Sequence, residues 1–176
     1  MKAKFLVVLA LAAIGAAFYV GTVLATSANG FSGRTLATAR YDDINLHVNT
    51  QDPQHWNAMI KTVGASNLFV QDNTWDPTTC NPSPCVPTTG WHTHPGPSLV
   101  IVTQGSVTNY DGDDPSCTPH VYTAGTDHNA FVDPGDGSVH MIRDESGQIA
   151  KTIAVQLIPA GAARRQDIAD PGNCHF

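Results

Sequence analysis

Closely spaced turn signals constrain the fold of this chain more than any other feature. From residue 90 onward, short runs of apolar and β-branched residues alternate with turn residues about every eight to twelve positions. Such spacing is typical of sandwiches and barrels. The 12 prolines and 15 glycines punctuate the chain throughout, and no long amphipathic helical pattern or internal repeat occurs. At 176 residues, the sequence predicts one all-β domain.

The strands expected from alternation and β-branched runs are short. They cover residues 34–40, 44–49, 67–71, 90–94, 98–104, 106–110, 120–123, 130–132, 139–143 and 150–158. Residues 51–57 and the proline-rich segment 75–89 are expected to be loops, and the tail after residue 159 to be irregular.

The N-terminus has the pattern of a targeting segment. Lys2 and Lys4 precede residues 5–24, which carry no charge, and small residues follow up to Ala25. This pattern predicts an apolar signal or anchor helix at residues 1–25, and a secreted or extracytoplasmic protein. The apolar stretch is also long enough to stay uncleaved, so membrane anchoring by residues 5–24 is the alternative.

Four cysteines follow this segment, an even number that in an exported chain predicts disulfides. Cys80 and Cys85 bracket a turn-rich Asn-Pro-Ser-Pro segment, which leaves Cys117 to pair with Cys174. A zinc site is the weaker interpretation, because the spacing is not Cys-x-x-Cys.

The charge distribution argues against nucleic acid as a partner. The formal net charge is −6, and the only basic cluster is the pair Arg164 and Arg165. No glycine-rich phosphate loop, nucleophile elbow or pair of carboxylates at catalytic spacing occurs either. The membrane is expected to be a partner only through the N-terminal segment, if that segment is uncleaved.

Three histidines predict a metal pocket. His92 and His94 are two residues apart, so on a strand their side chains leave the same face. His140 follows after enough chain for several strands, and in a small barrel the three inward faces converge. Neutral imidazoles bind divalent transition metals, so the expected cofactor is Fe, Mn, Zn, Ni or Cu.

The two segments around these histidines resemble the two-part motif of the cupin superfamily. His92, His94 and Gly105 match the first motif, and Gly137 and His140 match the second. The resemblance covers roughly residues 60–160. It implies a cupin double-stranded β-helix, or jelly-roll, barrel with a metal held by His92, His94 and His140. It also implies a small-molecule ligand or substrate as the partner.

The chain departs from the cupin pattern at three positions. Ser98 stands where cupins place a glutamate ligand, Pro134 is displaced by one residue, and Asp144 replaces the usual asparagine. The resemblance therefore implies a three-histidine site, as in some cupin dioxygenases that use Fe(II). Two functions follow. One is an oxygenase-like or hydrolytic metal site, and the alternative is a non-catalytic small-molecule-binding or structural cupin module. Whether the chain is an enzyme stays open.

Gln156 is the candidate ligand-binding residue. It alternates on its strand with Val155 and Leu157, so its amide faces either the pocket, where it would orient a ligand or metal-bound water, or the solvent. The roles of His120 and His128 and the existence of a homodimer are left open. The expected division of the chain is a leader (1–25), a linker with N-terminal strands (26–58), the cupin barrel (59–160) and a C-terminal tail (161–176).

Overall fold

The computed structural model describes residues 25–51, 53 and 55–176. The predicted signal or anchor helix therefore lies outside the described residues, apart from Ala25. Within the described part, no helix has the length and apolar character needed to cross a membrane.

The described residues form strands and one short 3-10 helix, Pro77–Thr79. The strands are β1 (Phe31–Tyr41), β2 (Asn45–Asn49), β3 (Asn57–Lys61), β4 (Ser66–Trp75), β5 (His92–Thr93), β6 (Ser98–Gln104), β7 (Ser106–Asp111), β8 (His120–Thr123), β9 (Ala130–Asp133), β10 (His140–Arg143), β11 (Ala150–Pro159) and β12 (Gln166–Asp167). The all-β prediction is confirmed.

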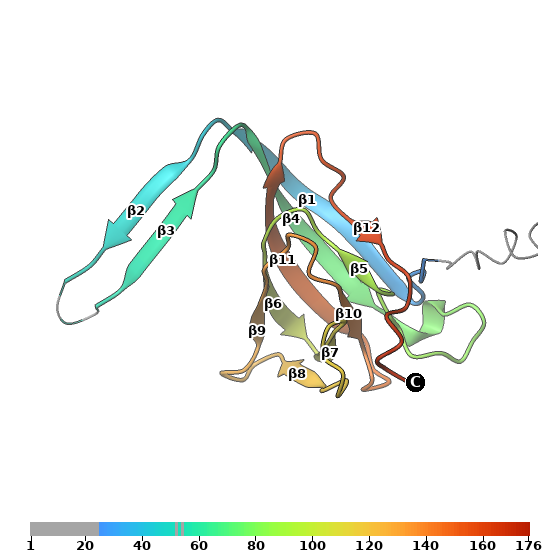
Figure 1. Cartoon of the computed structure of the whole chain (residues 1–176). Coiled ribbons are helices and arrows are strands. Elements are labelled where there is room, and N and C mark those ends of the chain that lie inside the picture. The colour runs from blue at the N-terminus through green and yellow to red at the C-terminus, as the bar shows by residue number, and fades with distance from the viewer. Residues whose placement is uncertain (1–24, 52, 54) are drawn as a thin grey trace, which may run out of the picture.

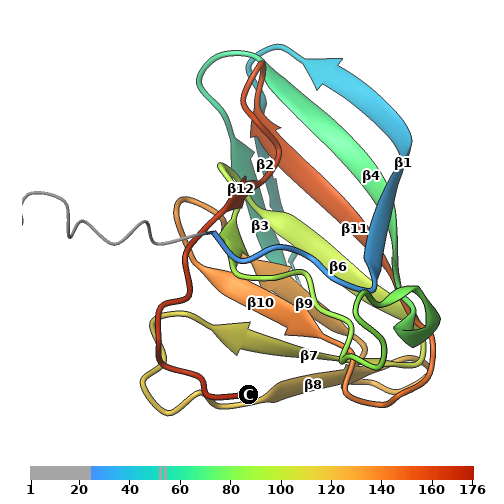
Figure 2. The same cartoon turned by 90° about the vertical axis from the view of Figure 1, so that its right-hand side faces the viewer.

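Two five-stranded sheets face each other around the interior (Figures 1 and 2). One has the order β1-β4-β11-β6-β9, and the other β12-β5-β10-β7-β8. The central eight strands pair antiparallel from the outside inward, β4 with β11, β5 with β10, β6 with β9 and β7 with β8. This nested pairing is a long ribbon wound into a jelly roll. Strands β2 and β3 form a separate hairpin.

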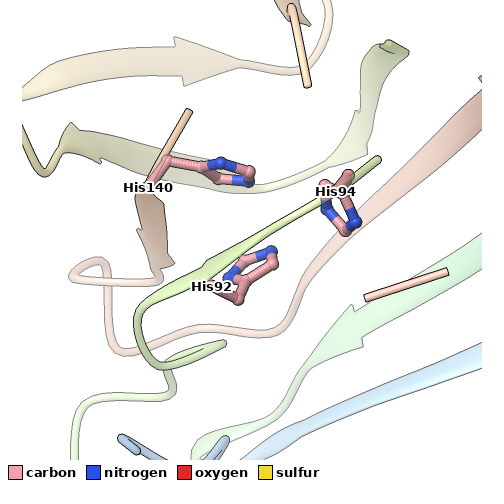
Figure 3. A group of neighbouring side chains, drawn as sticks. All are labelled: His92, His94 and His140. Atoms are coloured by element: carbon pink, nitrogen blue, oxygen red, sulfur yellow. The ribbon is translucent and has the colours of Figure 1, made fainter. Parts of the chain in front are cut away.

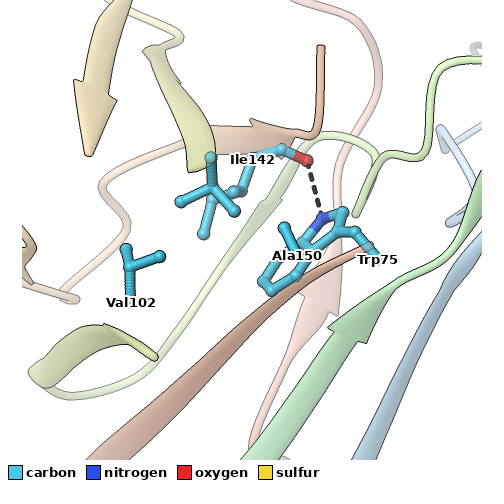
Figure 4. Packing of buried hydrophobic residues seen from close by; sticks show 5 residues of the cluster. Trp75, Val102, Ile142 and Ala150 are labelled. Carbon is cyan, nitrogen blue, oxygen red and sulfur yellow. Dashed lines mark hydrogen bonds between the residues drawn. The ribbon is translucent and has the colours of Figure 1, made fainter. Parts of the chain in front are cut away.

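The barrel interior has an apolar end and a polar end. Trp75, Val102, Ile142 and Ala150 pack together at the apolar end, where the Trp75 indole N–H donates to the carbonyl of Ile142 at 3.4 Å (Figure 4). Strand alternation continues inward along β6 to Ser98 at the other end. The change from valine to serine along one strand face makes that end of the interior suited to a site rather than to a core.

A second apolar cluster lies outside the β12-β5-β10-β7-β8 sheet and holds the tail. Trp91, Tyr110, Met141 and Cys174 are buried together. The two predicted disulfides, Cys80–Cys85 and Cys117–Cys174, are both confirmed. The second bridge attaches the tail to the sheet whose inner face carries the histidines.

Two strands were not expected from the sequence. Strand β3 follows the predicted loop and pairs with β2, and β12 lies in the tail that was expected to be irregular. Strand β12 is only two residues long, polar, and defined by its pairing with β5, so it leaves no alternation to detect. The division of the chain into leader, linker, barrel and tail stays a prediction.

Candidate metal centre

The three predicted histidines come together at the polar end of the barrel. His92 on β5 and His140 on β10 are directly opposite each other in the sheet, and His94 follows one residue after β5 (Figure 3). One ring nitrogen from each lies within 4.8 Å of the others. Three nitrogens that bind one tetrahedral ion at about 2.0–2.1 Å are about 3.4 Å apart, so the rings would have to draw closer to share an ion. The convergence is as expected, and metal binding itself stays a prediction.

Backbone carbonyls orient two of the three rings. His92 Nδ1 lies 2.9 Å from the carbonyl oxygen of Gly90, and His94 Nδ1 lies 2.7 Å from that of Arg164. A carbonyl can only accept, so Nδ1 donates in both rings and the lone pair of each neutral imidazole is on Nε2. Metal-binding histidines are commonly oriented in this way by a hydrogen bond from the other ring nitrogen.

Burial keeps all three imidazoles neutral near pH 7. It is the main cause that lowers the pKa of His94 to about 4 and the pKa of His92 well below the usual 6.5. The pKa of His140 is lowered mainly by burial as well. Neutral imidazole is the form that binds a metal, so no proton has to be displaced at neutral pH.

Asp133, at the end of β9, is a site residue that sequence reasoning missed. It is 5% exposed, with Oδ2 at 3.9 Å from His94 Nε2 and Oδ1 at 3.7 Å from His140 Nδ1. Its carboxylate accepts from the Gly135 N–H at 3.0 Å and from the Ser98 hydroxyl at 3.4 Å. Among the described residues, no lysine or arginine is paired with it. A buried carboxylate without a cation is costly, and a divalent ion among the histidines would offset that cost.

Ser98 and Gln156 face the histidines from the opposite sheet. Both are buried, and they are direct partners across β6 and β11. The Gln156 amide Nε2–H donates to Ser98 Oγ at 3.2 Å, while Gln156 Oε1 has no partner. Of the two orientations left open by the sequence, Gln156 therefore adopts the inward one.

The enclosed space between the sheets is a cavity of about 150 Å³. Polar groups line it beside the histidines. Gln71 contributes a second buried amide oxygen without a partner, and Arg165 comes from the tail. The Arg165 guanidinium donates to Asp167 and to the carbonyl of Thr89. The cavity thus offers hydrogen-bond acceptors and two cationic groups, Arg164 and Arg165, to a small molecule.

His120 and His128 lie away from this cavity. The His120 ring is partly exposed and 3.7 Å from the Asp111 carboxylate. His128 is exposed and stacks on Tyr122. Neither side chain lines the space around the three histidines.

No family model matches the chain, and no curated protein matches it. Several solved structures have a similar chain path. The polyketide cyclase RemF from Streptomyces resistomycificus is 16% identical, with 85% of this chain and 84% of that chain covered and a TM-score of 0.49.

A cupin superfamily protein from Desulfitobacterium hafniense is 11% identical, with 71% and 81% covered and a TM-score of 0.39. An oxalate oxidase is 16% identical, with 53% of this chain and 46% of that chain covered and a TM-score of 0.39. The chain spans less than half the length of that oxidase. The jelly-roll description rests on the chain's own strand order.

Proposed function

We propose that this protein holds a divalent transition metal through His92, His94 and His140, and that the metal acts on a small polar molecule in the adjoining cavity. The observation that carries the proposal is the convergence of three buried imidazoles, two of which are oriented by backbone carbonyls. His92 and His94 donate through Nδ1 to backbone carbonyls, which leaves each Nε2 lone pair free, and the ligand nitrogens of all three lie close together.

The donor set fits such an ion. Three neutral imidazoles suit Fe, Mn, Zn, Ni or Cu, and the buried Asp133 carboxylate adds the negative charge that a dication requires nearby. When bound, the metal supplies Lewis-acid or redox chemistry. Asp133 accepts from Ser98 and thereby holds the Ser98 hydroxyl beside Gln156.

The cavity supports a small ligand that carries O–H or N–H groups. Gln71 and Gln156 each bury an amide oxygen that has no partner in the protein, and burying such an acceptor unpaired is unfavourable. A ligand that donates to both oxygens removes that cost. At about 150 Å³, the cavity limits the enclosed part of the ligand to a small molecule.

Metal analysis tests the proposal. Purified protein is expected to contain about one metal ion per chain, and the double variant His92→Ala with His94→Ala is expected to contain none. His120→Ala is the matched control and should retain the metal. Protein that stays metal-free after incubation with each of the five candidate ions, in the absence of chelator, would contradict the proposal.

The second candidate is a non-catalytic binding module, and the unpartnered amide oxygens of Gln71 and Gln156 support binding as much as turnover. The two functions separate in one experiment. Metal-loaded protein is screened against small hydroxylated molecules, with binding followed by calorimetry and product by mass spectrometry. Binding without product in every case supports the module, and metal-dependent product supports the enzyme.

The proposed location is extracytoplasmic. Two disulfides close within the described chain, as expected in an oxidising compartment. Cell fractionation together with N-terminal sequencing tests both this location and cleavage after Ala25.

A further inference from the structure

The hairpin of β2 and β3 projects from the barrel as an arm (Figure 1). Among the described strands, β2 and β3 pair only with each other. Leu46 pairs with Ile60 and Val48 with Ala58, so one face of the arm is entirely apolar. Leu46 and Ile60 are exposed on it. An isolated two-stranded hairpin is marginal in water, so this face needs a partner surface.

The outer face of the β1-β4-β11-β6-β9 sheet is apolar as well. Val70, Val155, Leu99 and Val132 form a row in direct register across β4, β11, β6 and β9. Leu99 is 58% exposed and Val132 is 62% exposed. Apolar residues in register across four strands are typical of a sheet face that packs against another layer. Much of this face is nevertheless exposed to solvent.

The arm and this outer face enclose a cleft of about 570 Å³. Ile60 lines it from the arm, Val63 from the connection between β3 and β4, and Leu99 and Leu157 from the sheet. In Figure 1 the arm lies on the outer side of that sheet, opposite the side where β5 and β10 lie. Lys61 is the only charged residue among those that line the cleft. Depletion of charge is the compositional mark of an interface core.

We propose that a second copy of this chain fills the cleft, with the arm of each copy lying against the outer face of the other. One molecule carries both the projecting apolar element and the surface that receives it, which is the condition for a two-fold symmetric contact. The inference goes beyond the metal site and does not depend on it.

The exposed area falls within the range of a stable dimer. The exposed apolar residues on the apolar face of the arm, just after β3 and on the sheet present on the order of 650 Å² per copy, and a standard interface buries roughly 600–1,000 Å² per partner. They are Leu46, Ile60, Val63, Leu99, Ile101 and Val132. Each copy has a net charge of −6, so association requires a surface of this kind, where few charges meet.

The fluorescence of Trp56 is expected to report this contact. Trp56, next to the start of β3, is 55% exposed, whereas Trp75 and Trp91 are 1% and 2% exposed. Dilution of the full chain from about 50 μM to nanomolar concentrations is expected to shift the tryptophan emission to the red. The shift should follow dissociation of the dimer in sedimentation velocity and disappear in Trp56→Phe. A monomer at all these concentrations would overturn the proposal.

Two variants test which surfaces meet. Leu99→Glu on the sheet and Ile60→Lys on the arm should each raise the dimer dissociation constant about thirtyfold or more, as expected for residues at the centre of an interface. Val121→Glu is the matched control, because Val121 is 48% exposed on β8 of the other sheet. It should leave the dissociation constant unchanged. Near-ultraviolet circular dichroism checks that each variant is folded.

Mixing the two variants gives the decisive result. A mixed dimer of Leu99→Glu and Ile60→Lys contains one intact arm-on-face contact and one that pairs Glu with Lys, so the mixture should associate although neither variant does alone. A Leu99→Glu dimer would indicate arm-on-arm contact, and an Ile60→Lys dimer would indicate face-on-face contact. Either result overturns the proposal. So does a Trp56 emission that responds to phosphatidylglycerol vesicles and not to protein concentration.

Discussion

Removal of the tail bridge Cys117–Cys174 should destabilise the protein more than removal of Cys80–Cys85. The first bridge spans 57 residues and the second spans 5. Loop-closure entropy gives about 4 kcal/mol for the longer loop and about 2 kcal/mol for the shorter one. Because both cysteines of each pair are changed to alanine, no free thiol is left, and the difference of about 2 kcal/mol reports the loop lengths.

The two bridges differ less in burial than in loop length, so the difference in the free energy of unfolding should reflect the loops. Cys174 is buried against Trp91, Tyr110 and Met141, and Cys80 is buried as well. Unfolding in guanidinium chloride, followed by far-ultraviolet circular dichroism at one protein concentration, gives the two free energies of unfolding relative to wild type. Equal destabilisation, or a larger loss in Cys80→Ala with Cys85→Ala, would refute the loop-entropy reasoning.

The same pair of variants tests how the tail supports the site. The tail supplies the Arg164 carbonyl that orients His94, and β12, which pairs with β5 beside His92. Cys117→Ala with Cys174→Ala should therefore also weaken metal binding, while the other double variant should not. Equal metal affinity in both would show that the tail is held in place without its bridge.

The remaining predictions concern the site. Asp133→Asn should weaken metal binding about ten- to a hundredfold in a chelator competition, because it removes the buried negative charge. Unchanged affinity would show that the Asp133 carboxylate does not stabilise the bound ion. In the same titration, Ser98→Glu should tighten metal binding and Ser98→Ala should change it little, because a carboxylate binds a cation and a hydroxyl hardly does. Unchanged affinity in Ser98→Glu together with lost affinity in Ser98→Ala would contradict the position given to Ser98. Gly135→Ala should lower the free energy of unfolding by about 2 kcal/mol or more, measured in denaturant. The φ angle of Gly135 is +70°, and an added Cβ would lie 2.4 Å from the backbone of Gly96. Wild-type stability of this variant would refute the close approach. Metal-free protein should lose stability as the pH falls from about 6.5 to about 4. Burial lowers the pKa of His94 to about 4, so the unfolded chain takes up the proton first. His94→Gln should make this pH dependence shallower in the same assay, while His92 and His140 keep part of it; an unchanged slope would contradict the assignment.

Much of the barrel could be predicted from the sequence because its strands are local patterns. Ser98–Gln104 alternates inward and outward residues between two turn signals, and β11 does the same over ten residues. The disulfide pairing was also predictable, because the short turn between Cys80 and Cys85 left one other pair. Each of these inferences needs only neighbouring residues or a count.

Features that depend on which segments pair with each other escaped prediction. Strand β12 exists through pairing with β5, and the arm exists because β3 pairs with β2 across a polar loop that contains a proline. The carbonyl of Arg164 orients His94 across 70 residues. A backbone carbonyl carries no side-chain signature, so sequence alone could not identify this contact.

Asp133 places a carboxylate beside the histidines although the position expected to supply one holds a serine. The sequence places Ser98 where a carboxylate was anticipated, which indicated a site of three histidines and no acid. In the folded chain Ser98 and Asp133 are direct partners across β6 and β9, and the Asp133 carboxylate reaches the same histidines from the neighbouring strand. The one available signal was an acidic residue at the inward position of a strand that alternates with Phe131, next to a Pro-Gly turn. Because a negative charge acts through space and not through sequence position, the strand beside the expected one can supply it. The absence of a motif residue is therefore weak evidence against a metal site when its cross-strand neighbour is a buried carboxylate.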